Sequence, residues 1–175
     1  MKTGAFAVIR MPSPSLAVAV KRITLVVLGW VAVSSALNLV WEIAQLPLYT
    51  IVRTEPFPRI AYAVLHCTIG DALIALGSFI AAGLATRHLY WPATHPLTGG
   101  GISTAFGLLY TAFSEWYNVY ETGAWAYSES MPLVFGIGVA PLLQWLIIPL
   151  ALLVFFRRRW RAQAAAPRFP AAAQG

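Results

Sequence analysis

Residues 23–41 read ITLVVLGWVAVSSALNLVW, nineteen residues without a charged side chain. A helix needs about 20 predominantly apolar residues to cross a bilayer, whereas a secretory signal has an apolar core of about 7–15. We therefore expect residues 23–49 to form an uncleaved membrane helix that kinks or ends at Pro47. The small residues at 34–36 also suit a signal-peptidase site, so cleavage of this helix remains an alternative.

Three further apolar stretches follow, and none alternates as a lipid-facing barrel strand would. The last ends at a basic cluster, residues 157–161, and Pro132 suits its first helical turn. The sequence predicts an all-α membrane protein, a four-transmembrane-helix bundle. The predicted transmembrane domain is 23–156, with helices at about 23–49, 60–86, 101–120 and 132–156. It is flanked by an N-terminal segment, 1–22, and a basic, disordered tail, 157–175.

The distribution of Lys and Arg predicts the orientation of this bundle, because cytoplasmic loops are enriched in basic residues. With the N-terminus inside, the outer side holds only Arg53 and Arg59. The inner side holds the other ten: Lys2, Arg10, Lys21, Arg22, Arg87, Arg157, Arg158, Arg159, Arg161 and Arg168. We therefore expect both termini to be cytoplasmic, in a bacterial-type inner (plasma) membrane.

Composition excludes several classes of protein. Charged residues make up only 10% of the chain, against about 25% in soluble domains. The basic residues flank apolar runs and form no basic face with interleaved aromatics, which excludes a nucleic-acid partner and indicates contact with the lipid bilayer. Cys67 is the only cysteine, so the chain has no internal disulfide and no CxxC motif. No P-loop, GxSxG or Rossmann motif is present, and no cofactor can be named.

The six acidic residues lie at or beyond mid-membrane on the outer side of the predicted bundle. Acidic residues contribute little to topology, so function is the better explanation of this asymmetry. Three of them fall in outer loops and are expected to be solvated: Glu55, Glu121 and Glu129. The other three fall within helices and are candidate site residues: Glu42, Asp71 and Glu115.

Two of the predicted helices carry polar stripes that contain Glu42 and Glu115. In each stripe the spacing is i, i+4, i+7, i+11, which keeps the four side chains on one helix face. The stripes are Asn38, Glu42, Gln45 and Tyr49 on the first helix, and Thr111, Glu115, Asn118 and Thr122 on the third. Both helices run outward, so the two Glu residues are expected at similar depth.

Asp71 is the most informative acidic residue, because a carboxylate at mid-membrane costs about 2.5–3.5 kcal/mol on insertion scales. Its alternative role is that of a neutral carboxyl group that hydrogen-bonds a neighbouring helix. His66 is a candidate base, but it lies five positions from Asp71 and shares no face with it on a regular helix. On the fourth helix, Pro141 and Pro149 are expected to break the helix beside the buried amide of Gln144.

These patterns lead to one list of candidate site residues. The catalytic candidates are Asp71, Glu115, Glu42 and His66. The substrate-binding candidates are Asn38, Gln45, Asn118, Gln144, Trp41 and Trp116, whose aromatic members would stabilise positive charge. Trp125 is expected to lie in an interfacial aromatic belt instead. The acidic residues and His66 are suitable metal ligands in type, but they lack a specific ligand spacing, and no metal site is predicted.

Three functions fit this pattern. The favoured hypothesis is a membrane-embedded enzyme of isomerase or cyclase type, which performs acid–base chemistry on an isoprenoid- or lipid-like substrate. The second is a cation or proton binding and transport protein, which would act as a homo-oligomer or an accessory subunit because four helices are few for a transporter. The third is a non-catalytic membrane assembly factor, in which the polar stripes hold helices together.

Overall fold

The computed structural model describes residues 16–165, with side chains for residues 16–159. The predictions for residues 1–15 and 166–175, Lys2, Arg10 and Arg168 included, lie outside the described residues. The four long helices are α1 (Leu16–Gln45), α3 (Phe57–Thr86), α5 (Pro96–Trp116) and α6 (Val139–Ala165). The short helices are η1 (Leu46–Leu48), α2 (Ile51–Thr54), α4 (Trp91–Thr94) and the π-helical η2 (Tyr117–Glu121). The strands are β1 (Leu133–Val134) and β2 (Ile137–Gly138).

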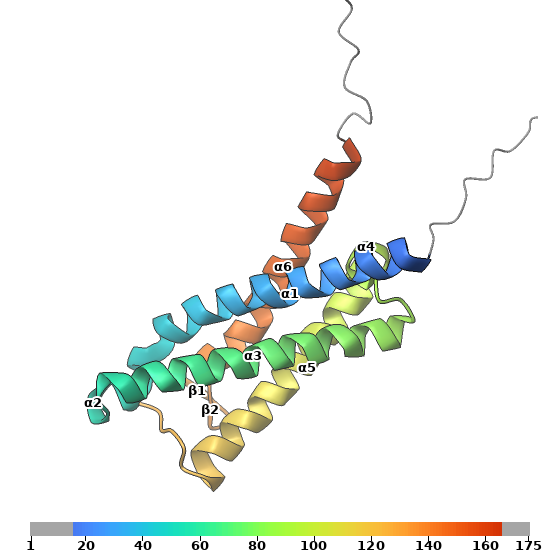
Figure 1. Ribbon diagram of the computed structural model, residues 1–175. Helices are drawn as coiled ribbons and strands as arrows, with labels where there is room; N and C mark the ends of the chain where they lie inside the picture. The colour runs from blue at the N-terminus through green and yellow to red at the C-terminus, as the bar shows by residue number, and fades with distance from the viewer. Residues whose placement is uncertain (1–15, 166–175) are drawn as a thin grey trace, which may run out of the picture.

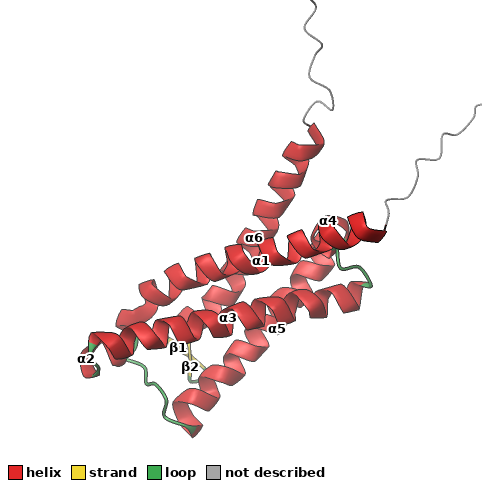
Figure 2. Ribbon diagram, viewed as in Figure 1, coloured by secondary structure: helices red, strands yellow, loops and turns green. Residues whose placement is uncertain are grey.

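The four long helices form a bundle in which consecutive helices are neighbours (Figure 1). α1 packs on α3, α3 on α5, α5 on α6, and α6 returns to α1. The start of α1, α4 and the last turns of α6 lie toward one end, which we call the inner end (Figure 1). The opposite, outer end holds α2, the end of α5 and the small β1–β2 hairpin (Figure 2).

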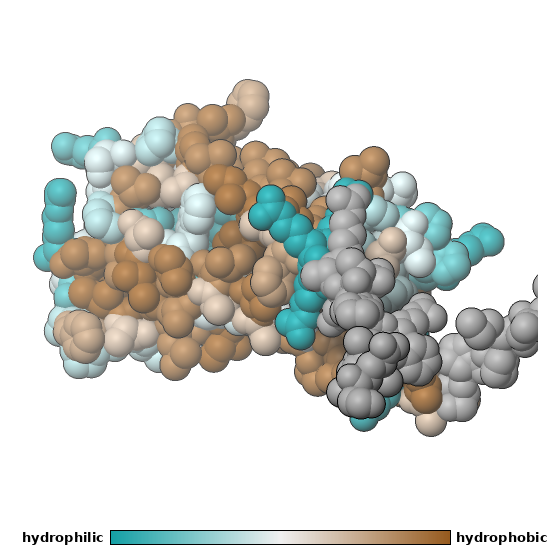
Figure 3. All heavy atoms as spheres, turned by 90° about the horizontal axis from the view of Figure 1, so that it is seen from above, coloured by the Kyte–Doolittle hydropathy of each residue, from teal (hydrophilic) through white to brown (hydrophobic). Residues whose placement is uncertain are grey.

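Within residues 16–165, three helical segments are long and apolar enough to cross a membrane: Leu16–Leu48, Phe57–Thr86 and Val139–Arg159. They are consistent with an integral membrane protein, and hydrophobic residues predominate over the middle of the face drawn in Figure 3. α5 is not among them, because its 21 residues include several Gly, Ser and Thr and one Glu. The fourth membrane crossing therefore stays a prediction.

The fourth long helix begins later than the sequence predicts. A two-residue hairpin occupies the expected first turns, with Leu133 paired to Gly138. Its turn residues, Phe135 and Gly136, have φ angles of 51° and 82°, as a type I′ turn requires. The helix expected from residue 132 therefore starts at Val139.

This later start also corrects the expectation that prolines break the helix. Pro141 now falls in the first turn of α6, where the backbone N–H has no partner to lose. α6 remains helical through Pro149 and runs on to Ala165, into a segment that was expected to be disordered. The polar site beside Gln144 is thus built on a continuous helix.

An aromatic core fills the bundle toward the inner end. The indole ring of Trp30 packs on Phe79, Trp91 and Phe156, with ring centroids 5.2–5.7 Å apart. Trp91 is fully buried, and its indole N–H donates a hydrogen bond to the Phe79 carbonyl oxygen at 3.1 Å. These rings fill the centre of the bundle toward the inner end, and a cavity among the four long helices lies nearer the outer end.

A close approach of α5 and α6 places one wall of that cavity. A Cβ atom added at Gly107 of α5 would lie 2.0 Å from the ring of Trp145 on α6. Glycine is therefore the residue that lets the Trp145 ring lie flat against α5. The ring is buried there beside Gln144, its neighbour in sequence.

Candidate functional site

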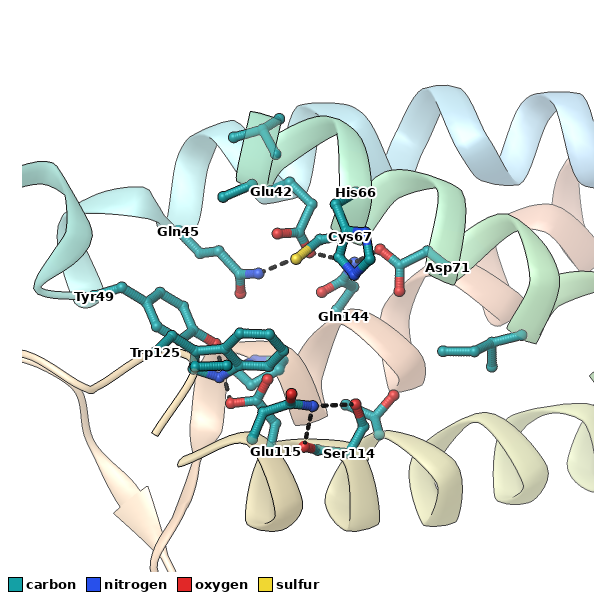
Figure 4. Close-up of a pocket in the computed structure, with 18 of the residues that line it drawn as sticks. Glu42, Gln45, Tyr49, His66, Cys67, Asp71, Ser114, Glu115, Trp125 and Gln144 are labelled. Atoms are coloured by element: carbon teal, nitrogen blue, oxygen red, sulfur yellow. Dashed lines mark hydrogen bonds between the residues drawn. The ribbon is translucent and has the colours of Figure 1, made fainter. Parts of the chain in front are cut away.

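A cavity of about 350 Å³ lies among the four long helices in the outer half of the bundle. Each long helix supplies polar side chains to its wall, and the segments after α1 and α5 line its outer end (Figure 4). Seven of the ten predicted site residues line it: Glu42, Gln45, His66, Asp71, Glu115, Asn118 and Gln144. The structure thus brings polar residues from the separate predicted helices to one space.

The Gln144 amide links three helices at the inner side of this cavity. Its Nε2 donates to Asn38 Oδ1 at 2.9 Å, to Asp71 Oδ2 at 2.9 Å and to Glu42 Oε1 at 3.3 Å. The side chain is only 2% exposed. An amide has two N–H hydrogens, so three acceptors compete for two donors. Gln144 therefore positions both carboxyl groups relative to α6.

Glu42 and Asp71 form a carboxyl pair. Their side chains lie within hydrogen-bonding reach of each other, and Gln45 Nε2 donates to Glu42 Oε1 at 2.9 Å. Among the described residues, no Lys or Arg lines the cavity. Two adjacent carboxyl groups without a balancing cation repel each other when both are ionised, so one proton held between them would be favourable.

Glu115 lies across the cavity in a different environment. Its Oε2 accepts hydrogen bonds from the phenol groups of Tyr127 at 2.7 Å and Tyr49 at 3.2 Å. The Tyr127 phenol oxygen in turn accepts the backbone N–H of Gly138 at 3.0 Å. Burial, and then the neighbouring Glu115, raises the pKa of both tyrosines above the ordinary value of 10.0. Both phenols are therefore protonated donors to Glu115 at neutral pH.

The loop between α5 and α6 explains how the two tyrosines meet. The loop backbone pairs with the segment after α1: Thr50 N–H donates to Ala126 O at 3.0 Å, and Ser128 N–H to Leu48 O at 2.9 Å. A β-bridge joins residues 49 and 127 between these bonds. The spacing of polar residues places Tyr49 on a helix stripe, but such local spacing cannot pair two segments so far apart in the chain.

His66 lines the mouth of the cavity from α3. Its side chain is exposed and stacks on Tyr62, with ring centroids 5.8 Å apart. α3 is regular between His66 and Asp71, so the two side chains face different neighbours, as their spacing predicts. His66 also lines a second hollow of about 480 Å³ between α2, α3 and residues 123–126. We call this hollow the vestibule.

Three predicted binding residues do not line the cavity. Asn38 lies behind it, accepting from Gln144 and donating to Ser34 Oγ at 3.1 Å. Trp41 packs against the buried hydrophobic cluster of the bundle, and Trp116 is 43% exposed on α5. The indole rings that do line the cavity belong to Trp125 and Trp145. Trp125, which was expected in an interfacial belt, thus also lines the cavity, because the loop that carries it folds over the cavity.

Among the described residues, no three His, Cys, Asp or Glu side chains are placed to hold a metal ion together. The polar stripes are instead satisfied largely by hydrogen bonds within the chain, between α1, α3 and α6 and between Tyr49 and α5. Comparison with known proteins adds no relative: neither a family model, nor a curated protein, nor a solved structure matches the chain.

Proposed function

We propose that the protein is a membrane-embedded acid–base enzyme that acts on an isoprenoid- or lipid-like molecule. The observation that carries this proposal is the arrangement of three carboxyl groups around one cavity. Glu42 and Asp71 are paired on one side, and Glu115 is held by two phenols on the other. The volume of about 350 Å³ lies within the range of small-molecule sites, about 300–1,000 Å³.

The unequal environments of the carboxyl groups suit an acid and a base that work on one substrate. The shared proton of the Glu42–Asp71 pair would be donated to a carbon–carbon double bond, and Gln144 would stabilise the carboxylate that remains. Glu115 would accept a proton from a neighbouring carbon. Proton return from Glu115 to the pair through water at the cavity mouth would restore the starting state, so the net reaction is an isomerisation.

The walls of the cavity support a cationic intermediate. The indole rings of Trp125 and Trp145 and the phenol of Tyr49 line it, and aromatic faces attract positive charge. The carboxylates add to this attraction, because Coulomb interactions are stronger away from bulk water. A protein that only joined helices would not need this surplus of acidic groups around an open space.

Deuterium incorporation tests the proposal whatever the product is. The protein would be reconstituted in liposomes in D₂O with a panel of linear and cyclic isoprenoids, and the recovered molecules analysed by mass spectrometry. Protonation of carbon by the carboxyl pair introduces carbon-bound deuterium. Glu42→Gln and Asp71→Asn are each expected to slow incorporation by about 10²–10⁴-fold, the usual contribution of a general acid or base. Glu129→Gln, which changes an exposed loop residue, is the matched control. Equal incorporation by all four proteins would refute the proposal.

Cation or proton binding is the second candidate function. The observation that favours it is the presence of three acidic residues and no Lys or Arg among the described residues of the cavity wall. Carboxylates within membranes often bind or relay cations. Proton flux into liposomes that carry an internal pH dye would separate the candidates. Flux without any isoprenoid, abolished by Asp71→Asn, would favour transport, and a homo-oligomer would then be expected.

A further inference from the structure

Three polar atoms in the cavity wall are buried without a hydrogen-bond partner among the described residues. They are Gln45 Oε1, Thr111 Oγ1 and Trp125 Nε1. Gln45 is 6% exposed and Thr111 is 7% exposed. The indole N–H of Trp125 is near Glu115 but forms no hydrogen bond of ordinary geometry with it. Buried polar groups in proteins almost always have partners, so a bound molecule is expected to supply them.

The chemistry of the three atoms restricts that molecule. Gln45 Oε1 accepts a hydrogen bond, Trp125 Nε1 donates one, and the Thr111 hydroxyl does either. A hydroxyl group both donates and accepts, so it can be a hydrogen-bond partner for each of these atoms. An ammonium group would be attracted by the carboxyl groups, but it only donates hydrogen bonds and would leave the indole N–H of Trp125 unpartnered. A phosphate would add negative charge beside the three carboxyl groups, with no Lys or Arg in the described wall to balance it.

We propose that the ligand of this cavity is an uncharged lipid-phase alcohol. Its hydroxyl group binds Gln45, Thr111 and Trp125, and phosphorylated lipids are excluded. This inference rests on the proposed function and names the substrate class for the same site. The ligand enters through the vestibule, which shares Cys67 with the cavity wall. The apolar part of the ligand lies against aliphatic side chains that also line the cavity: Leu46, Ile51, Val64 and Ile74.

A head-group series with a constant tail tests the inference on the full chain. The probes are farnesol, farnesylamine and farnesyl phosphate. Cys67 provides the readout, because it is the only cysteine in the sequence and lies where the cavity meets the vestibule. Labelling with a small methanethiosulfonate reagent is followed by intact-protein mass spectrometry, and Cys67→Ser gives the background. We expect farnesol to protect Cys67 at concentrations about 10-fold below farnesylamine and about 100-fold below farnesyl phosphate.

Matched variants test whether the unpartnered atoms in the cavity wall cause the preference for the alcohol. Thr111→Val removes the hydroxyl at constant shape, and Trp125→Phe removes the indole N–H. The chain offers a control for each. The Thr104 hydroxyl and the Trp41 indole N–H are also buried without partners in the described structure, but neither residue lines the cavity. Thr111→Val and Trp125→Phe are expected to weaken farnesol protection about 2- to 10-fold, the effect of one hydrogen bond. Thr104→Val and Trp41→Phe are expected to change it less than about 2-fold.

The possible outcomes test the alcohol assignment and the proposed function separately. Equal or stronger protection by farnesylamine or farnesyl phosphate overturns the alcohol assignment but leaves a lipid-phase ligand in place. Equal effects of Thr111→Val and Thr104→Val also overturn it, because the hydroxyl facing the cavity would then have no special role. Protection by none of the three probes overturns both the inference and the proposed lipid-phase substrate. The wild-type head-group comparison needs no variant, so it stands even if a variant fails to fold.

Discussion

Replacement of Gln144 by Leu is expected to destabilise the bundle, because Gln144 is the only side chain that joins α1, α3 and α6 by hydrogen bonds in the described part of the chain. Leu has a similar volume and leaves the acceptors on Asn38, Glu42 and Asp71 without this donor. Interhelical side-chain hydrogen bonds in membrane proteins contribute about 0.6 kcal/mol on average and at most about 1.7. Because the Gln144 amide has two N–H hydrogens, its replacement is expected to lower the free energy of unfolding by about 1–3 kcal/mol.

The measurement is a double-mutant cycle on purified protein in mixed micelles, with unfolding followed against the mole fraction of denaturing detergent. Asn38→Leu, Gln144→Leu and the double variant give the coupling energy between the two helices. It is expected to be about 0.6–1.7 kcal/mol, because the direct bond of 2.9 Å is lost only once. Leu150→Ala, at an exposed position of α6, controls for general effects on the helix. A coupling energy near zero would refute this role for Gln144.

Three further outcomes are expected. Gly107→Ala should lower the unfolding midpoint strongly, because its methyl group would lie 2.0 Å from the Trp145 ring, whereas Gly101→Ala meets nothing within 4 Å; equal midpoints would contradict the packing of α5 on α6. Because the pKa values of Tyr49 and Tyr127 are raised in the folded protein, the contribution of these two residues to stability should be constant below pH 10 and should be lost as the pH rises further. Thermal unfolding of Tyr49→Phe and Tyr127→Phe should show a smaller alkaline loss than wild type, and an unchanged loss would count against the Glu115 contacts. An epitope tag inserted in the loop after η2 should be accessible from outside intact cells if α5 crosses the membrane, and protection of the tag would mean that it does not.

The helices themselves were largely predictable. Long apolar runs identify the three segments that can cross a membrane, because burial in lipid demands continuous apolar sequence and internal backbone hydrogen bonds. The run at 101–120 corresponds to α5, which carries many small and polar residues and is not among these three segments. The hairpin before α6 was missed, since Phe135 is not a residue usually expected at positive φ, and Pro132 is a reasonable first helical residue.

The candidate site was predictable only in part. Spacing on one helix places Glu42 and Gln45 on one face, and the cost of a buried charge marks Asp71. Neither argument identifies Tyr127, which comes from a loop. Neither argument shows that Trp125 lines the cavity and Trp116 does not. Those assignments depend on the path of the loop after η2, which is set by backbone hydrogen bonds to residues 48 and 50.

The sequence by itself determined that this is a helical chain suited to a membrane, with acidic side chains toward one end. Hydrophobic length and helical periodicity are local properties, and both can be read along the chain. Only the tertiary structure decided that Glu42 pairs with Asp71 through Gln144, that Glu115 is held by Tyr49 and Tyr127, and that three polar atoms remain unpartnered around the cavity. The rotation and depth of one helix against another decide such contacts, and they depend on packing across the whole bundle.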